Sequence, residues 1–281
     1  MYLQRFSGTR CCLCGSTDRL TSEHKIKASA LRAEFGNEAL FVGTSGDSTQ
    51  KLRSAQSANS KHLKFPVQIC EACNTARTQP ADREFDRFHG LAIEVLGGKE
   101  DPGKVFDLPQ YRVGSAPYLN VFRYFAKLMC CHIAAVNGPV PTTLAEFAIG
   151  RNSLNRIWLR LKSDPSFLHM VLIIGDHRYA AHGGLIVYGD KNTHEANGFH
   201  STLTLGPLQY VFHMRLEGFE KEKIRETFPD FQEWCVREVE SALRNPISDS
   251  DLIRAGLNDE SARQSLARDV IAPASLRQRR A

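Results

Sequence analysis

Residues 11–14 read CCLC and residues 70–74 read CEACN, and these two stretches decide what the first part of the chain folds around. Each contains a C-x-x-C pair, and two such pairs supply the four thiolates of a tetrahedral zinc site. Cys12 leaves the register of the first pair open, but the spacing from Cys12 to Cys14 is shorter than that of a usual knuckle. We therefore expect a structural zinc ion with four ligands: Cys11, Cys14, Cys70 and Cys73.

The two cysteine pairs are separated by residues 15–69, which is longer than the roughly 15–20 residues of compact zinc sites. Residues 36–60 lack regular apolar periodicity and are rich in glycine and serine, so we predict a long insertion with little fixed structure. Residues 48–70 carry four basic residues and no acidic one, which fits either contact with a nucleic-acid backbone or a solvated loop. The basic residues are Lys51, Arg53, Lys61 and Lys64.

Residues 20–26, LTSEHKI, predict a strand that presents Glu23 beside His24, and residues 73–83 predict the opening of a helix. With the cysteine pairs, these residues resemble the HNH (ββα-metal) endonuclease family, specifically members with two C-x-x-C knuckles. The resemblance covers roughly residues 11–88. Glu23-His24 is similar to the family's acidic residue and histidine, and Cys73-Asn74 is similar to its cysteine and asparagine.

The helix after the second knuckle departs from the family because no histidine stands at its last expected position. Asp82 is the substitute that we expect there, and Glu84, Asp86 and His89 are close enough in sequence to compete for that role.

The resemblance implies a metal-dependent endonuclease. His24 would be the general base, because an imidazole titrates near neutral pH. Glu23 and Asp82 would bind the catalytic Mg²⁺ or Mn²⁺, and Asn74 would orient His24 through a side-chain hydrogen bond. Four basic residues are the expected nucleic-acid contacts: Arg77, Arg83, Lys61 and Lys64.

A glycine-rich linker at residues 97–103 predicts two units, an HNH nuclease domain at 1–98 and a second α+β domain at 104–281. In the second unit we expect helices at 118–136 and from Thr143 towards Lys162, and a helix at 219–243. The last 35 or so residues predict short charged helices or a tail. Three strand-rich runs predict a small antiparallel sheet, at residues 167–175, 179–188 and 201–216.

The composition is that of an ordinary globular chain, with 42% hydrophobic and 24% charged residues. A net charge of +5 fits a polyanionic partner. The most apolar run, residues 125–136, is interrupted by Lys127 and His132, so we expect no membrane span. Without an apolar leader, a cytoplasmic location with reduced thiols is expected. Cys130 and Cys131 are expected to pack in a core.

The function expected from the sequence is hydrolysis of phosphodiester bonds, with DNA as the expected substrate. A zinc-dependent nucleic-acid-binding module without catalysis is the alternative, and a ribonuclease or toxin built on the same residues is a third. Residues 104–281 are expected to select a target, sense a signal or mediate assembly, including assembly with a second copy of the chain. Restriction, defence against phage, mobile-element function and repair are all compatible with this pattern.

Overall fold

The computed structural model describes residues 3–5, 8–45, 53–164, 167 and 178–244, and its fold is mixed α+β. The strands are β1 (Leu3–Arg5), β2 (Leu20–His24), β3 (Leu40–Ser45), β4 (Arg53–Ala55), β5 (Lys64–Cys70), β6 (Pro139–Pro141), β7 (Trp158–Ser163), β8 (Tyr179–Gly183), β9 (Ile186–Gly189), β10 (Ala196–Leu205) and β11 (Leu208–Arg215). The α-helices are α1 (Ala28–Phe35), α2 (Gln79–Gly97), α3 (Ala116–Ala135), α4 (Thr142–Ala148), α6 (Gly218–Thr227) and α7 (Pro229–Arg244). Shorter helical turns are η1 (Lys61–Leu63), η2 (Ala72–Arg77), η3 (Pro102–Asp107) and η4 (Pro109–Tyr111).

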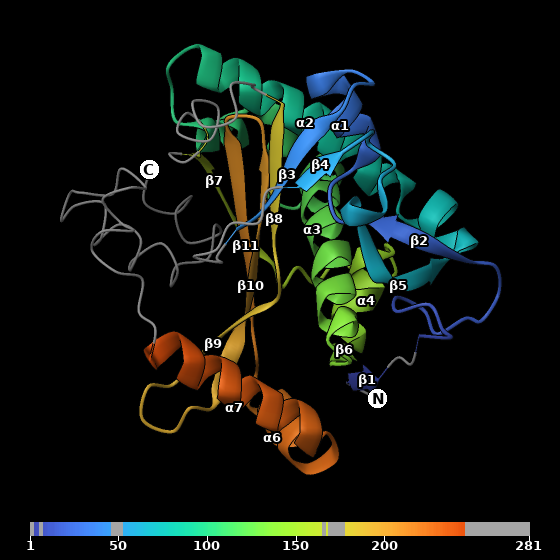
Figure 1. Cartoon of the computed structure of the whole chain (residues 1–281), viewed down its shortest axis with the longest axis vertical. Helices are drawn as coiled ribbons and strands as arrows, with labels where there is room; N and C mark the ends of the chain where they lie inside the picture. Colours follow the sequence, from blue (N-terminus) through green and yellow to red (C-terminus); the bar gives the residue numbers. More distant parts are fainter. Residues whose placement is uncertain (1–2, 6–7, 46–52, 165–166, 168–177, 245–281) are drawn as a thin grey trace.

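The largest sheet has seven strands in the order β4-β3-β8-β10-β11-β7, with β9 also pairing with β10. Its pairs are antiparallel except for β3 and β8, which run parallel. Two small sheets pair β1 with β6 and β2 with β5. The large sheet stands on one side of α3 and the β2–β5 pair on the other (Figure 1).

Helix α3 is the centre of the core. Ser115 begins it, because its hydroxyl accepts a hydrogen bond from the Tyr118 amide. Phe125 contacts Phe212 of the large sheet, with ring centroids 5.2 Å apart, and His132 contacts Phe65 of β5 at 4.8 Å. A helix buried on all sides must be apolar all round, which explains the composition of α3 and makes its lysine unusual.

The β2–β5 pair leads directly into η2 and α2, so residues 20–97 contain two antiparallel strands followed by a helix. The pairing register shifts between Ser22 and His24, opposite the stretch of β5 that contains Pro66. Proline cannot donate a ladder hydrogen bond, so it is tolerated at such an irregularity. The shift leaves Glu23 buried and the preceding Ser22 exposed.

The predicted unstructured insertion at residues 36–60 is wrong for two of its parts, because residues 40–45 form β3 and residues 53–55 form β4. Residues 46–52 lie outside the described part of the chain. Strand β3 pairs in parallel with β8, which lies far away in the sequence. Local periodicity could not reveal this strand, because its partner is supplied by tertiary structure.

The helix predicted from Thr143 towards Lys162 is wrong in extent. Helix α4 ends at Ala148, and Gly150 adopts a positive φ of 77°. Residues 158–163 form β7, with Leu159 and Leu161 buried on one face of the sheet. The predicted 118–136 helix is confirmed as α3, and the predicted helix at 219–243 is interrupted before Pro229, which separates α6 from α7.

Strands β8, β9, β10 and β11 occupy the regions predicted as strands at 179–188 and 201–216. The sheet is larger than the small antiparallel one expected, because β3, β4 and β7 also belong to it. The expected strand at 167–175 and the last 35 residues lie outside the described residues, apart from Phe167. Among the residues described, no helix is both long enough and apolar enough to cross a bilayer.

The predicted units 1–98 and 104–281 share one sheet and one core. Strand β3 lies before the predicted linker, yet it pairs with β8 after it. Phe85 of α2 stacks on Tyr124 of α3, with ring centroids 3.9 Å apart. The site described next therefore draws residues from both sides of the predicted linker.

Candidate functional site

The four cysteines predicted as zinc ligands converge at the start of β2 and the end of β5. Their sulfur atoms all lie within 4.8 Å of one another, and the sulfurs of Cys14 and Cys70 are 3.6 Å apart. Zinc–thiolate bonds of about 2.3 Å in tetrahedral geometry place ligand sulfurs about 3.8 Å apart, so the cluster fits a zinc ion. This is the only group in the described part of the chain with such an arrangement.

Local turns bring each cysteine pair into position. Gly15 follows the first pair with a φ of 76° and donates to the Cys11 carbonyl oxygen at 2.8 Å. A hydrogen bond from the Cys73 thiol lowers the pKa of Cys11, which favours a thiolate within the cluster. Cys12 lies outside the cluster, with its sulfur 3.7 Å from that of Cys131 on α3. The register predicted for the first pair is the one that forms the cluster.

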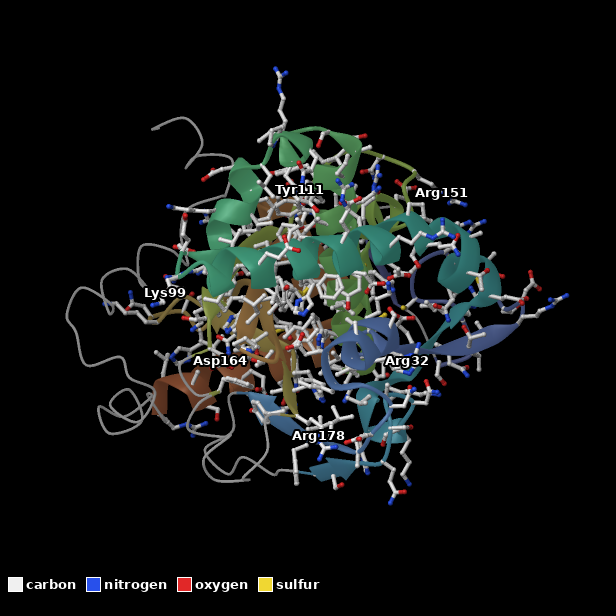
Figure 2. The ribbon with its side chains drawn as sticks, turned by 90° about the horizontal axis from the view of Figure 1, so that it is seen from above. Arg32, Lys99, Tyr111, Arg151, Asp164 and Arg178 are labelled. Atoms are coloured by element: carbon white, nitrogen blue, oxygen red, sulfur yellow. The ribbon has the colours of Figure 1, made fainter. Side chains whose placement is uncertain are left out.

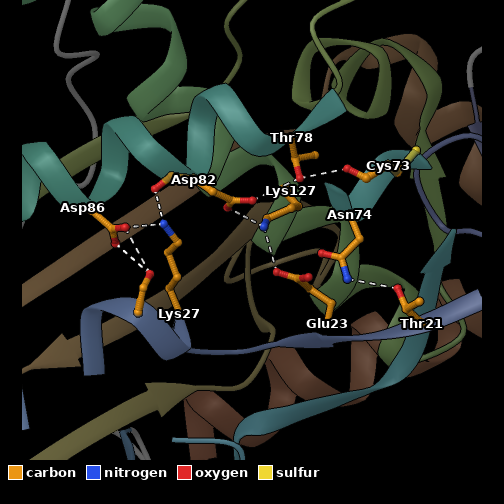
Figure 3. Close-up of polar contacts among 10 residues, drawn as sticks. Thr21, Glu23, Lys27, Cys73, Asn74, Thr78, Asp82, Asp86 and Lys127 are labelled. Atoms are coloured by element: carbon orange, nitrogen blue, oxygen red, sulfur yellow. Dashed lines mark hydrogen bonds and ion pairs between the residues drawn. The ribbon is translucent and has the colours of Figure 1, made fainter. Parts of the chain in front are cut away.

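A second polar cluster lies between β2, α2 and α3 (Figure 3). Lys127 extends from α3 and places its Nζ 2.8 Å from Glu23 Oε1 and 2.7 Å from Asp82 Oδ1. The side chains of Lys127, Glu23 and Asp82 are 2%, 8% and 15% exposed. We call these three residues the carboxylate–lysine cluster. Burial by itself lowers the pKa of Lys127, but attraction to Glu23 and Asp82 outweighs it, so the pKa is raised and Lys127 stays charged.

Glu23 and Asp82, the predicted ligands of the catalytic divalent ion, thus lie close together, but the group between them is the Lys127 ammonium. A Mg²⁺ ion needs carboxylate oxygens at about 2.0–2.1 Å with near-octahedral geometry, and the position between Glu23 and Asp82 is filled by Lys127 Nζ. As arranged, this pair does not fit a divalent ion.

Neighbouring hydrogen bonds hold Asp82 in place. The Thr78 hydroxyl lies 3.2 Å from Asp82 Oδ2 and 2.9 Å from the Cys73 carbonyl oxygen, which links Asp82 to the second cysteine pair. Lys27 hydrogen-bonds the Asp82 carbonyl oxygen and lies 2.6 Å from Asp86 Oδ2 (Figure 3).

Glu84, Asp86 and His89 were the alternatives to Asp82 as the second ligand of the catalytic ion, and each has another partner. Asp86 accepts a hydrogen bond from Ser29 as well as from Lys27. Glu84 accepts one from the Tyr111 hydroxyl at 2.9 Å. His89 is buried, with its Nδ1 2.7 Å from the Tyr210 hydroxyl. Asp82 is therefore the member of this group that faces Glu23.

His24 ends β2 and is partly buried. Burial lowers its pKa, and the positive charges of Lys64, Lys127 and Arg32 lower it further. Its Nε2 is buried without a hydrogen-bond partner in the described structure. The imidazole is therefore neutral at neutral pH.

Asn74 does not make the hydrogen bond predicted for it. Its Nδ2 donates to Thr21 Oγ1 at 3.0 Å rather than to His24, and thereby ties η2 to β2. The Thr21 hydroxyl in turn donates to the Ile69 carbonyl oxygen of β5. Asn74 thus fixes the junction of the two strands and the helix, and His24 is positioned by the backbone of β2.

The predicted nucleic-acid contacts lie at different places around this unit. Arg77 is exposed, and its Nη1 donates to Cys73 Sγ at 3.5 Å. Arg83 is exposed on α2 and Lys61 is exposed on η1. Lys64 is half-buried and pairs with His24 in the register of β5 and β2.

A depression of about 520 Å³ lies beside the cysteine cluster. Arg77 lines it together with Arg19 and Arg151, and Arg151 comes from the segment after α4. Seen from above, Arg151 lies on the opposite side of the molecule from Lys99 (Figure 2). Asp18 and Glu71 line the same depression, and Arg19 pairs with Glu71 at 2.6 Å, so its lining carries both positive and negative groups.

Lys127 and Arg151 are two residues of these sites for which the sequence predicts no role. A signal for Lys127 exists, because a lysine inside an apolar helix is almost never fully buried unless it is paired. Its carboxylate partners could not be identified from spacing, since Glu23 and Asp82 lie in distant segments. Arg151 carries no local signal.

Comparisons of the chain with protein-family models, curated proteins and solved structures found no match. The functional assignment therefore rests on the geometry and chemistry of the residues themselves.

Proposed function

We propose that this protein is an endonuclease that hydrolyses phosphodiester bonds, with His24 as the general base and DNA as its substrate. The observation that carries the proposal is the unit of β2, β5 and α2, with four clustered cysteines at one end and His24 at the end of β2. This order of two strands and a helix is the one expected of a ββα-metal nuclease.

The environment of His24 suits a base. A neutral imidazole can take a proton from water, and burial, together with the cations around His24, keeps it neutral by lowering its pKa. The water oxygen would then attack phosphorus as the bond to the leaving oxygen breaks. Lys64 and Arg32 supply positive charge near His24, which would offset the negative charge that builds on the phosphate.

A zinc would hold the two strands and the helix together through Cys11, Cys14, Cys70 and Cys73. Its contribution would be structural, because four thiolates leave no open position for water or substrate. The zinc itself would therefore take no direct part in the reaction at His24.

Two observations favour the second candidate, a nucleic-acid-binding module without catalysis. The position between the two carboxylates expected to hold a catalytic ion is occupied by the Lys127 ammonium, and Asn74 bonds Thr21 instead of His24. Such a module would use exposed basic residues, including Arg77, Arg83 and Lys61, to contact phosphates.

Cleavage of supercoiled plasmid separates the two candidates. The zinc-loaded protein is incubated with DNA, with and without Mg²⁺ or Mn²⁺, beside His24→Ala and the control His62→Ala. We expect the parent and His62→Ala to nick or linearise DNA, and His24→Ala to be slower by about 10²–10⁴-fold, as for loss of a general base. A structured RNA tests the ribonuclease alternative in parallel.

Binding of a labelled duplex at increasing salt completes the test. If every variant binds DNA with the same salt dependence and none cleaves DNA or RNA, the binding-module function is correct and the nuclease proposal fails. If His24→Ala cleaves as fast as the parent, His24 is not the base.

A further inference from the structure

Lys127 lies where two carboxylates from different elements converge on a single cation. Glu23 comes from β2 and Asp82 from α2, and each places one oxygen within 2.8 Å of the ammonium. The cluster therefore already has the two features of a cation site: carboxylates that converge and burial that strengthens their attraction.

We propose that Lys127 is a built-in cation that replaces the divalent ion between Glu23 and Asp82, so that this protein's phosphodiester chemistry uses no metal ion at this pair. The inference deepens the proposed nuclease function and rests on it for its catalytic part. Its structural part, the exclusion of a divalent ion by Lys127, can be measured without any activity.

Displacement of the ammonium by an incoming ion is opposed by the surroundings. Lys127 is 2% exposed and comes from the centre of the most buried helix, so its side chain has no path to solvent. Tyr124 adds to this enclosure, with its ring centroid 5.4 Å from Lys127 Nζ. An ion that bound here would have to leave a charged lysine buried without its partners, which is strongly unfavourable.

The built-in cation also acts on the proposed base. Lys127 is one of the three cations that lower the pKa of His24, and it is the one fixed by the core. The same charge that pairs with Glu23 and Asp82 thus adds to the effect of burial in keeping His24 neutral. A buried ammonium held by two carboxylates cannot exchange with solvent ions, so its charge is permanent.

Binding of Mn²⁺ to the zinc-loaded full-length protein, followed by electron paramagnetic resonance, tests the inference. Four proteins are compared: the parent, Glu23→Gln, Lys127→Ala and the double variant Lys127→Ala/Glu23→Gln. We expect no Glu23-dependent Mn²⁺ binding in the parent. Lys127→Ala vacates the position between the carboxylates and is expected to raise Mn²⁺ affinity by at least about tenfold, and the double variant to lose this gain.

Lys27→Ala is the matched control, because Lys27 contacts the same helix but bonds Asp86 and the Asp82 backbone. It should not create a Mn²⁺ site. Melting curves and zinc content report folding, and Lys127→Gln replaces Lys127→Ala if the alanine variant does not fold.

Two outcomes overturn the inference. If the parent binds Mn²⁺ and Glu23→Gln abolishes that binding, the ion displaces Lys127 from its position between the carboxylates. If neither folded Lys127 variant gains a Mn²⁺ site, the pair is not a cation position that lysine has taken over. Cleavage by the parent in divalent-free buffer tests the catalytic part, and absence of cleavage under every condition refutes the nuclease function while the Mn²⁺ result still decides the role of Lys127.

Discussion

The cysteine cluster and the carboxylate–lysine cluster both include residues of the β2–β5–α2 unit, and they are built in opposite ways. The cysteine cluster uses two short pairs, each shaped by its own turn. The carboxylate–lysine cluster takes one residue from each of three elements, and none is placed by a local motif. The first is specified by spacing and the second by packing.

The difference has an energetic side. Four thiolates need a metal ion to hold them together, and binding of that ion contributes directly to folding. The two carboxylates of the other cluster need no external partner, because Lys127 supplies the charge from within the chain. One unit thus combines a site that requires an ion with a site that has replaced one.

The largest effect should come from the cysteine cluster. Cys11→Ser removes one of its four thiols and is expected to abolish stoichiometric zinc binding, at a cost in unfolding free energy above about 4 kcal/mol. Cys12→Ser is the matched control, since Cys12 is equally buried but lies outside the cluster. It should keep zinc and lose about 1–3 kcal/mol for a buried hydroxyl. Zinc analysis and urea unfolding measure both, and loss of zinc in Cys12→Ser alone would mean that the register is wrong.

The carboxylate–lysine cluster should respond next. Lys127→Met removes the cation shared by two carboxylates and leaves Asp82 with only the Thr78 hydroxyl, and it should cost about 3–5 kcal/mol in unfolding free energy. Lys27→Met should cost only about 1 kcal/mol, because Lys27 and Asp86 are 18% and 39% exposed. Neutralising the cluster completely, with Glu23→Gln and Asp82→Asn added to Lys127→Met, should recover part of the loss. Equal losses from the two lysine variants would contradict the special role of burial in this cluster.

A smaller and graded effect is expected from acid, through buried histidines of α3 and the large sheet. Burial lowers the pKa of His132 to about 3, and that of His182 and His213 to about 4. Below pH 6.5 the unfolded chain binds protons that these folded histidines do not. Stability is therefore full above about pH 6.5, falls as the pH decreases towards 4 and then levels off, with a slope of at most about 1.4 kcal/mol per pH unit for each histidine.

Urea unfolding at pH 8, 7, 6 and 5 checks this, with zinc content measured at each pH to separate loss of the metal. Between pH 8 and 7 the buried histidines should cause almost no change in the free energy of unfolding. His213→Phe keeps the ring contact with Trp158 and removes one titrating group, so its slope should be shallower than the parent's. An unchanged slope would show that His213 is not held neutral in the folded protein.

The sequence predicted the local parts of the molecule well. Helix α3, the strand that carries Glu23 and His24, and the four clustered cysteines were all recognisable, because each has its own short signature. Strand β3 and the end of α4 were mispredicted, because their outcome depends on pairing with β8 and on the formation of β7.

The sequence by itself determined which cysteines come together and that β2 carries a carboxyl group and an imidazole side by side. C-x-x-C spacing and strand alternation depend on only a few neighbouring residues, so the local sequence is sufficient to predict these features. Only the tertiary structure decided that Lys127 lies between Glu23 and Asp82 and that Asn74 bonds Thr21. These contacts depend on how α3 packs between the large sheet and the β2–β5 pair, and a buried charge acquires its partner only when that packing brings distant elements within a few ångströms.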